Sequence, residues 1–289
     1  MLLACVVGTG CGSTIPTDAS GAYVAEIEEY RAAREERLRA EYGWLSLVGL
    51  FWLEPGANTL GSAPGSAVSL PEGAAPPAAG TFRYDRGVVR LEAAPDSGIT
   101  LGGETVTSVD LEPNVEVRLG RLAFFVIERA GRHAIRVKDP QSPVRTDFGG
   151  LDHYPIDPSF RVEARLRRHA SPREVEVATV TGSPARFLVP GVLEFELQGR
   201  PHALEPLISK PGESQLFLIF KDETSGRETY GAGRYLYATL EGDRAVVDFN
   251  KAYNPPCAFT PFATCPLPPG ANRLESRIES GERAFAPAH

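Results

Sequence analysis

The segment from Asp248 to Pro269, DFNKAYNPPCAFTPFATCPLPP, gathers polar side chains, aromatic rings, prolines and two cysteines in one short stretch. Prolines fix φ and remove backbone donors, so they lower the entropy cost of holding one path. Polar groups held beside apolar walls are typical of a ligand pocket. The segment therefore predicts a rigid loop whose ligand-binding residues are Asp248, Asn250, Lys251, Tyr253 and Asn254. The alternative for the two asparagines is hydrogen bonding to turn backbone.

A second segment, GRETYGAGRYL, places Gly231 and Gly233 in an otherwise aromatic strand. Glycine in a strand marks a bulge or a close approach by a neighbouring strand or a ligand. We expect Arg234 to face the same pocket as Lys251, where two cations would favour an anionic or carboxylate-bearing occupant. Two further candidates from this segment are Glu228 and Tyr230. The alternative is a barrel bend with a surface ion pair.

The loop KDPQSPVRTDF contributes two further candidate ligand-binding residues, Lys138 and Arg145. A serine nucleophile at Ser142 would need a base and an oxyanion hole, and no G-x-S-x-G elbow is present. We expect Asp139 and Ser142 to cap the turn, and Arg145 to pair with a carboxylate.

Cys257 and Cys265 close a short loop, which favours a disulfide in an exported protein. Two free thiols in apolar surroundings are the main alternative, and a metal site or a nucleophile is a third. No CxxC, HExxH or paired histidines occur, so the sequence predicts no metal site and no cofactor.

The first residues, MLLACVVGTGCGSTIPTDASG, form a short apolar run followed by small polar residues. This pattern resembles the end of a secretory leader, although it lacks a basic n-region. Leu2 to Cys5 looks like the lipobox of bacterial lipoproteins, and Cys11 is better placed behind the apolar run. We expect a membrane-anchored lipoprotein of the cell envelope, lipidated at Cys11 or Cys5, that contacts the membrane through its lipid anchor only.

Apolar residues recur every three or four positions from Tyr23 to Tyr42, which predicts an amphipathic helix. The apolar stretch Gly43 to Gly56 suits a buried segment leading into a strand. Short alternating segments bounded by Gly and Pro follow, and Gly102-Gly103 predicts a two-residue hairpin turn. The tail NRLESRIESGERAF is expected to form a closing helix. The expected divisions are a leader at 1–20, the helix and apolar segment at 21–56, a small sandwich at 57–137 and an antiparallel β domain at 138–289.

The strand rhythm from Asn58 to Asp139, including the LGGE hairpin, resembles forkhead-associated-type sandwiches. Those domains read phosphothreonine with an arginine just after the first glycine. Here Ser62 follows Gly61, so the resemblance implies the fold and not the phosphopeptide function. The expected fold is mainly β: an N-terminal helix, a small forkhead-associated-like β-sandwich, then a larger antiparallel β-sandwich or barrel.

Four segments together resemble domain-of-unknown-function family 1684 of bacteria and archaea. They are GWLSLVGLFWLEPG, KDPQSPVRTDFGGLDHYPIDPSFRV, GRETYGAGRYL and DFNKAYNPPCAFTPFATCPLPPGANRL. The resemblance covers most of the chain and implies no reaction and no catalytic residue.

A net charge of −7 argues against nucleic acid as a partner. The favoured function is binding of a small polar or anionic molecule at the cell envelope. One alternative is a metal-independent hydrolase or other enzyme that uses Asp248, Lys251 and Tyr253. Another is a structural envelope protein without a small-molecule site.

Overall fold

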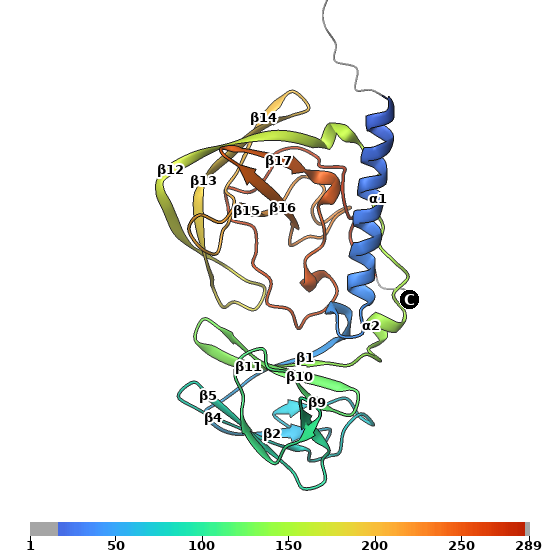
Figure 1. Cartoon of the computed structure of the whole chain (residues 1–289), viewed down its shortest axis with the longest axis vertical. Coiled ribbons are helices and arrows are strands. Elements are labelled where there is room, and N and C mark those ends of the chain that lie inside the picture. The colour runs from blue at the N-terminus through green and yellow to red at the C-terminus, as the bar shows by residue number, and fades with distance from the viewer. Residues whose placement is uncertain (1–16, 287–289) are drawn as a thin grey trace, which may run out of the picture.

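The computed structural model describes residues 17–286, and the expected lipidation sites Cys5 and Cys11 lie outside that range. Figure 1 shows a smaller and a larger β body, with one long helix running along the larger body. The expectation of a mainly β protein with an N-terminal helix is confirmed. Among the described residues, no helix is long and apolar enough to cross a membrane.

The helix α1 spans Thr17–Arg39 and buries Ile27 and Leu38, as the periodicity predicts. It ends three residues before Tyr42 because the chain turns there, with the Gly43 N–H donating to the Ala40 carbonyl. The other helical pieces are short: η1 (Trp44–Ser46), α2 (Pro143–Thr146), η2 (Pro158–Phe160), η3 (Phe249–Lys251) and η4 (Pro256–Ala258).

The smaller body is a sandwich of two sheets. One has the order β1-β11-β10-β9-β6-β7 and the other the order β3-β2-β4-β5-β8. The strands are β1 (Leu47–Trp52), β2 (Gly56–Gly61), β3 (Val68–Ser69), β4 (Gly80–Asp85), β5 (Val88–Ala93), β6 (Ile99–Leu101), β7 (Glu104–Thr105), β8 (Ser108–Asp110), β9 (Val117–Leu119), β10 (Leu122–Arg129) and β11 (Arg132–Lys138). β1 pairs with β11, so the sandwich begins before the expected boundary at residue 57. The Gly102-Gly103 hairpin is confirmed by the pairing of Leu101 with Glu104.

The larger body is built on one strongly curved sheet with the order β14-β13-β12-β17-β16-β15 (Figure 1). Its strands are β12 (Arg161–Val177), β13 (Ala185–Leu197), β14 (Arg200–Leu204), β15 (Gln215–Phe220), β16 (Arg234–Glu241) and β17 (Arg244–Asp248). All paired neighbours are antiparallel, which fits the alternating pattern of the sequence.

The expected closing helix within the tail is wrong. Residues 272–285 run extended along the larger body. The Leu274 N–H donates to the Lys221 carbonyl, and the Glu223 N–H donates to the Ser276 carbonyl. Backbone bonds to a neighbouring segment satisfy the groups that a helix would otherwise pair internally.

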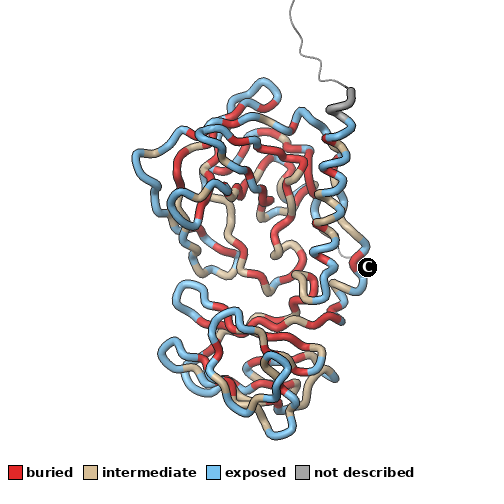
Figure 2. The backbone as a smooth tube through the Cα atoms, in the orientation of Figure 1, coloured by how far each residue is buried: buried red, intermediate tan, exposed pale blue. Residues whose placement is uncertain are grey.

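The proline-rich loop lies at the joint between the two bodies. Thr260 Oγ1 donates to the Leu47 carbonyl over 3.2 Å, and Arg136 Nη2 lies 3.3 Å from Thr264 Oγ1. Figure 2 shows separate runs of buried backbone inside each body. The rigid loop therefore joins two separately packed cores, which accounts for its prolines and aromatic rings.

Candidate functional site

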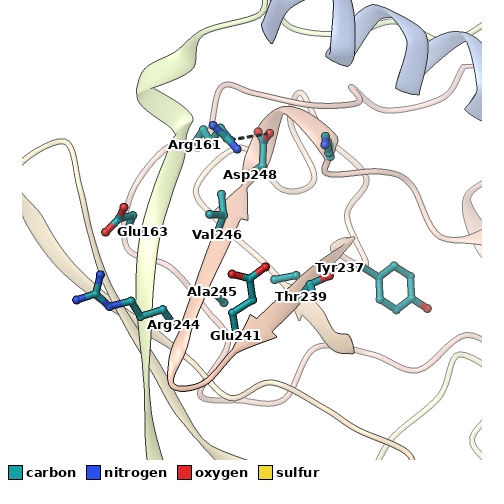
Figure 3. Close-up of a pocket in the computed structure, with 11 residues that line it drawn as sticks. Arg161, Glu163, Tyr237, Thr239, Glu241, Arg244, Ala245, Val246 and Asp248 are labelled. Atoms are coloured by element: carbon teal, nitrogen blue, oxygen red, sulfur yellow. Dashed lines mark ion pairs between the residues drawn. The ribbon is translucent and has the colours of Figure 1, made fainter. Parts of the chain in front are cut away.

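The hairpin formed by β16 and β17 opens soon after its turn. The two strands pair only at Leu240 with Ala245 and at Glu241 with Arg244. Beyond those pairs β17 leads into η3, and the returning chain rejoins β16 at Tyr235, which exchanges two backbone hydrogen bonds of 2.9 Å with Tyr253. Figure 3 shows β16 and β17 diverging from their shared turn. The divergence leaves a V-shaped cleft between two strands of one sheet.

Backbone groups on both arms point into this cleft. Alternate residues of an antiparallel strand direct their N–H and C=O groups to the same side. Because Tyr235 bonds to Tyr253 on the cleft side, the backbone groups of Tyr237 and Thr239 also face the cleft. On the other arm Arg244 pairs with Glu241, so the backbone groups of Val246 face it too. The described strand ladders give these three residues no partner across the gap.

The cleft has a volume of about 380 Å³, which is within the range of small-molecule sites. β12 contributes Arg161 and Glu163 to its lining, β16 contributes Glu241, and β17 contributes Arg244 and Asp248. With Lys251 from η3, three cations face three carboxylates, and the formal charges sum to zero. This balance favours a neutral or zwitterionic occupant over the anion that the sequence favours.

Asp248 is the most constrained charged group of the cleft. One carboxylate oxygen, Oδ1, accepts hydrogen bonds from the Tyr23 hydroxyl at 2.8 Å and from the Asn250 N–H at 3.1 Å. The other oxygen, Oδ2, is buried and has no hydrogen-bond partner among the described residues. Arg161 Nε lies 3.8 Å from it, farther than a hydrogen bond (Figure 3). An unpartnered carboxylate oxygen on a residue that lines a cavity gains stability when a ligand N–H or O–H group donates to it.

Lys251 lies at the same end of the cleft as Asp248. Its ammonium pairs with the Glu26 carboxylate of α1, and this hydrogen bond lowers the pKa of Glu26. The Lys251 carbonyl accepts a hydrogen bond from the Tyr30 hydroxyl over 3.0 Å. Burial raises the pKa of Tyr30 to about 12, so that hydroxyl stays a donor throughout the physiological range. Helix α1 thus holds Lys251 at this end of the cleft.

Two exposed apolar side chains flank the opening. Tyr237 on β16 is 48% exposed and Val246 on β17 is 42% exposed. The Tyr237 ring stacks on Phe217, with centroids 5.0 Å apart, and on Tyr253, with centroids 6.4 Å apart. A row of stacked rings beside a polar cleft provides a rigid apolar surface for an occupant.

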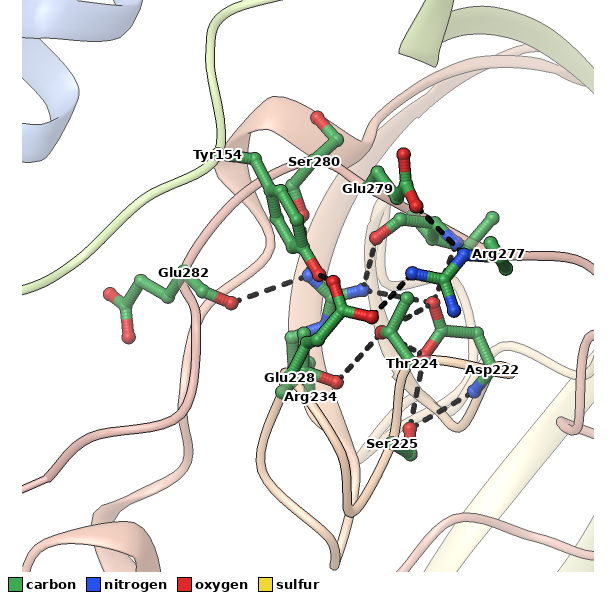
Figure 4. Close-up of polar contacts among 12 residues, drawn as sticks. Tyr154, Asp222, Thr224, Ser225, Glu228, Arg234, Arg277, Glu279, Ser280 and Glu282 are labelled. Atoms are coloured by element: carbon green, nitrogen blue, oxygen red, sulfur yellow. Dashed lines mark hydrogen bonds and ion pairs between the residues drawn. The ribbon is translucent and has the colours of Figure 1, made fainter.

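The structure does not place Arg234 in this cleft, so the expectation that Arg234 and Lys251 share one concavity is wrong. The Arg234 side chain is fully buried and donates to the carbonyl oxygens of Ile278 and Ser280, and it pairs with the Asp222 carboxylate (Figure 4). A buried guanidinium needs such partners to offset its desolvation, and the extended tail supplies them. Arg234 therefore fastens the tail to the sheet.

Glu228 and Tyr230 also lie apart from the cleft. Glu228 pairs with Arg277 and accepts a hydrogen bond of 2.8 Å from the Tyr154 hydroxyl (Figure 4). Its bond to Arg277 lowers the pKa of Glu228. The Tyr230 hydroxyl donates to the Cys257 carbonyl over 2.9 Å, which ties the preceding turn to the proline-rich loop.

Both candidate asparagines are buried and hold the loop. Asn250 accepts from the Asp157 N–H at 3.0 Å and donates to the Asp157 carbonyl at 2.8 Å. Asn254 donates to the Arg283 carbonyl at 2.7 Å. Neither asparagine lines the cleft, and these side-chain bonds go to the backbone of segments distant in the sequence rather than to their own turn. Tyr253 is half-buried beneath the Arg34 guanidinium, which lies 4.8 Å from its ring centroid.

Lys138 and Arg145 both bind the end of α1 and the turn after it. The Lys138 ammonium donates to the Tyr42 carbonyl. Arg145 Nε donates to the carbonyls of Arg39 and Ala40 at 3.1 and 3.2 Å, so the expected carboxylate partner is wrong. Cations are favourable at the carbonyl end of a helix. Of the expected turn caps, Asp139 accepts from the Gln141 N–H at 2.8 Å, whereas Ser142 makes no capping bond through its side chain.

Cys257 and Cys265 are free thiols, so the expected disulfide is absent from the structure. The Cys257 N–H donates to Cys265 Sγ at 3.2 Å. A hydrogen bond from the Cys265 thiol lowers the pKa of Cys257. That hydrogen bond and burial together raise the pKa of Cys265. Among residues 17–286, no group of His, Cys, Asp and Glu side chains could hold a metal ion.

The sequence interpretation missed most of the cleft lining, including Arg161, Glu163, Tyr237 and Val246. A signal was present, because outward positions alternate along RVEAR and along RYLYATLE. That signal predicts which side chains point to each face of a strand. The position of the cleft depends instead on where the two strands separate.

The family model described as a protein of unknown function, DUF1684, matches residues 146–283. An uncharacterised protein from Haloarcula marismortui, solved by NMR in solution, is 38% identical over 50% of this chain and 83% of its own, with a TM-score of 0.42. The chain belongs to the DUF1684 family. The resemblance read from the sequence is confirmed, and its first segment, GWLSLVGLFWLEPG, lies outside the residues that the model matches.

A second solved structure is described as "Structural and functional analysis of phosphothreonine-dependent FHA domain interactions". It is 20% identical over 31% of this chain and 92% of its own, with a TM-score of 0.24. The search of curated proteins found no match. The DUF1684 cleft is therefore interpreted from its own geometry.

Proposed function

We propose that the cleft between β16 and β17 binds a small polar molecule that carries both a hydrogen-bond donor and an acidic group. The observation that carries this proposal is Asp248, which lines the cleft and whose buried Oδ2 has no hydrogen-bond partner among the described residues. A ligand donor would satisfy that oxygen, and Arg161 and Lys251 would accept the acidic group at the same end. The balanced charge of the lining supports a zwitterion more than a bare anion.

Binding has more support than the alternative of an enzyme that uses Asp248, Lys251 and Tyr253. Asp248 bonds to Tyr23, Lys251 pairs with Glu26, and the Tyr253 ring lies under Arg34. A nucleophile and its base need to lie within hydrogen-bond reach of each other, and these three side chains make no hydrogen bond among themselves in the described region.

A thermal-shift panel of amino acids, dipeptides, betaines and dicarboxylates tests the proposal. A zwitterion that binds only the folded form should raise the melting temperature in a concentration-dependent way. Arg161→Gln should lower the affinity for that ligand at least about tenfold, because a charge-assisted hydrogen bond is lost. Arg167→Gln is the matched control, since Arg167 lies on the same strand and pairs with Glu194 outside the cleft lining. No stabilising compound, or equal effects of the two variants, would refute the proposal.

We further propose that this binding takes place at the cell envelope, with the chain anchored through Cys11 or Cys5. The support is the leader-like pattern of the sequence. Fractionation of native cells should place the protein with membranes, and a double Cys→Ser change should release it. Wild-type protein found wholly in the cytosol would refute the location without affecting the cleft.

A further inference from the structure

We infer that the cleft recognises the main chain of a short peptide, bound in extended form between β16 and β17. This inference rests on the proposed function and names the class of its ligand. The cleft is a gap in a β-sheet, and the groups that a sheet uses to pair a strand are present on both of its sides. An extended peptide is the chemical class that matches such a gap.

Both arms of the cleft present backbone donors and acceptors. Tyr237 and Thr239 on one arm, and Val246 on the other, direct N–H and C=O groups into the opening. A simple anion can accept hydrogen bonds from the N–H groups but leaves the carbonyl oxygens unpaired. A peptide offers alternating donors and acceptors along one line, so it can satisfy both.

The charged side chains of the cleft are distributed unevenly along its length. Arg161 and Lys251 line the cleft at the end marked by Asp248, and Glu241 lies at the hairpin turn. A peptide with free termini carries a carboxylate and an ammonium at opposite ends. Arg161 and Lys251 outnumber Asp248 at that end and suit the carboxylate, which places the peptide antiparallel to β16 with its ammonium toward Glu241 and Arg244 at the turn. A peptide N–H near the carboxylate end can donate to Asp248 Oδ2.

The ends of the cleft limit the length of a bound peptide. The cleft is bounded at one end by the Leu240–Ala245 pair and at the other by the Tyr235–Tyr253 bridge. Between those limits, the described part of β16 presents free backbone groups only at Tyr237 and Thr239, so the occupant is short. The exposed Tyr237 and Val246 side chains flank the opening and favour small apolar side chains on the peptide.

The experiment uses the full-length protein with trialanine as the probe and isothermal calorimetry as the readout. The matched non-peptide is ω-aminooctanoate, which separates its ammonium and carboxylate by the same number of chain atoms but has no amide. We expect trialanine to bind at least about tenfold more tightly, because only trialanine can pair with the backbone groups. N-methylation of the central alanine should remove most of that advantage, because its N–H faces one arm. Methylation of the third alanine should also weaken binding, because the neighbouring N–H faces the opposite arm.

Amide hydrogen exchange gives a second readout. Bound trialanine should slow exchange at Tyr237, Thr239 and Val246 and leave Ala238 unchanged, since Ala238 already belongs to the ladder with Leu216. Protection spread evenly over the molecule would overturn the inference.

The outcomes separate the two proposals. If ω-aminooctanoate binds as tightly as trialanine and Arg161→Gln weakens both, the cleft binds zwitterions and main-chain recognition is wrong. If neither trialanine nor any dipeptide binds but an amino acid or a betaine of the thermal-shift panel does, main-chain recognition is again wrong and the proposed function stands. If no compound binds, both are refuted.

Discussion

Arg234 Nη2 lies 3.2 Å from Asp222 Oδ2, and the two side chains are 1% and 0% exposed. The Asp222 carboxylate also accepts a hydrogen bond of 2.7 Å from the Ile278 N–H, while Arg234 donates to the Ile278 carbonyl at 2.8 Å. One residue of the tail is therefore held by both members of a buried ion pair. The pair fixes the tail against the sheet and does not contact the cleft.

Arg234→Met should lower the free energy of unfolding by about 3–5 kcal/mol, because it leaves the Asp222 carboxylate buried without its cation. Urea denaturation followed by fluorescence measures this change. The exposed pair of Arg167 and Glu194 is the comparison, and Arg167→Gln should cost less than about 1 kcal/mol. Equal effects of the two substitutions would show that the buried pair has no special role in stability.

His153 should make stability depend on pH. Burial, with a smaller contribution from the nearby Arg31 cation, lowers the pKa of His153 from 6.5 to about 4 in the folded chain. Between those values the unfolded chain binds a proton that the folded chain does not, so stability is fully present above pH 6.5 and falls as the pH approaches 4. Since the ring is only partly buried, we expect about 1–2 kcal/mol from this residue.

His153→Asn tests this expectation and keeps a donor for the Leu151 carbonyl, which lies 3.1 Å from His153 Nδ1. Denaturation curves of wild type and variant should differ in slope against pH within the window from 4 to 6.5. Parallel curves through that window would contradict the assignment.

The two loop thiols should react at different rates. The pKa of Cys257 is lowered by its neighbour and that of Cys265 is raised, so Cys257 carries the larger thiolate fraction. Brief iodoacetamide treatment followed by digestion and mass spectrometry should label Cys257 first and should label both after denaturation. A peptide pair joined through Cys257 and Cys265 in untreated protein would contradict the free thiols of the structure.

Amide exchange in the ligand-free protein should reveal the opened hairpin. Tyr237 and Thr239 N–H groups should exchange at least about 100-fold faster than those of Tyr235 and Ala238 on the same strand. Tyr235 is bonded to Tyr253, and Ala238 belongs to the ladder with Leu216. NMR or mass-spectrometric exchange measures these rates. Uniform protection along β16 would mean that the strands close in solution and that no cleft forms.

Local patterns in the sequence predict the elements well, because helix and strand periodicity depend on neighbouring residues. Ile27 and Leu38 follow the helical period of α1, and the Gly102-Gly103 turn follows hairpin chemistry. Gly233 also marks a close approach as expected, since a Cβ there would lie 2.6 Å from the Phe220 carbonyl oxygen. These features need no knowledge of the distant chain.

The site was harder to predict because it depends on contacts between distant residues. Arg234 resembles a pocket residue until the tail carbonyls of Ile278 and Ser280 surround it. Asp248 and Lys251 do line the cleft, yet the opening beside them exists because Tyr253 bridges to Tyr235 and holds β17 away. The residue pattern from Asp248 to Tyr253 does not predict that β16 and β17 separate.

Helix α1 lies outside residues 146–283, which the family model matches, yet Tyr23 and Glu26 on that helix bond to Asp248 and Lys251. The family-matched region alone would therefore present this end of the cleft without two of its partners. A fragment trimmed to that region, or a graft of it onto another scaffold, would carry an unsupported Asp248 and an unpaired Lys251. A unit that keeps these contacts must include α1, and the sandwich strands from β1 to β11 lie between α1 and the larger sheet in the sequence.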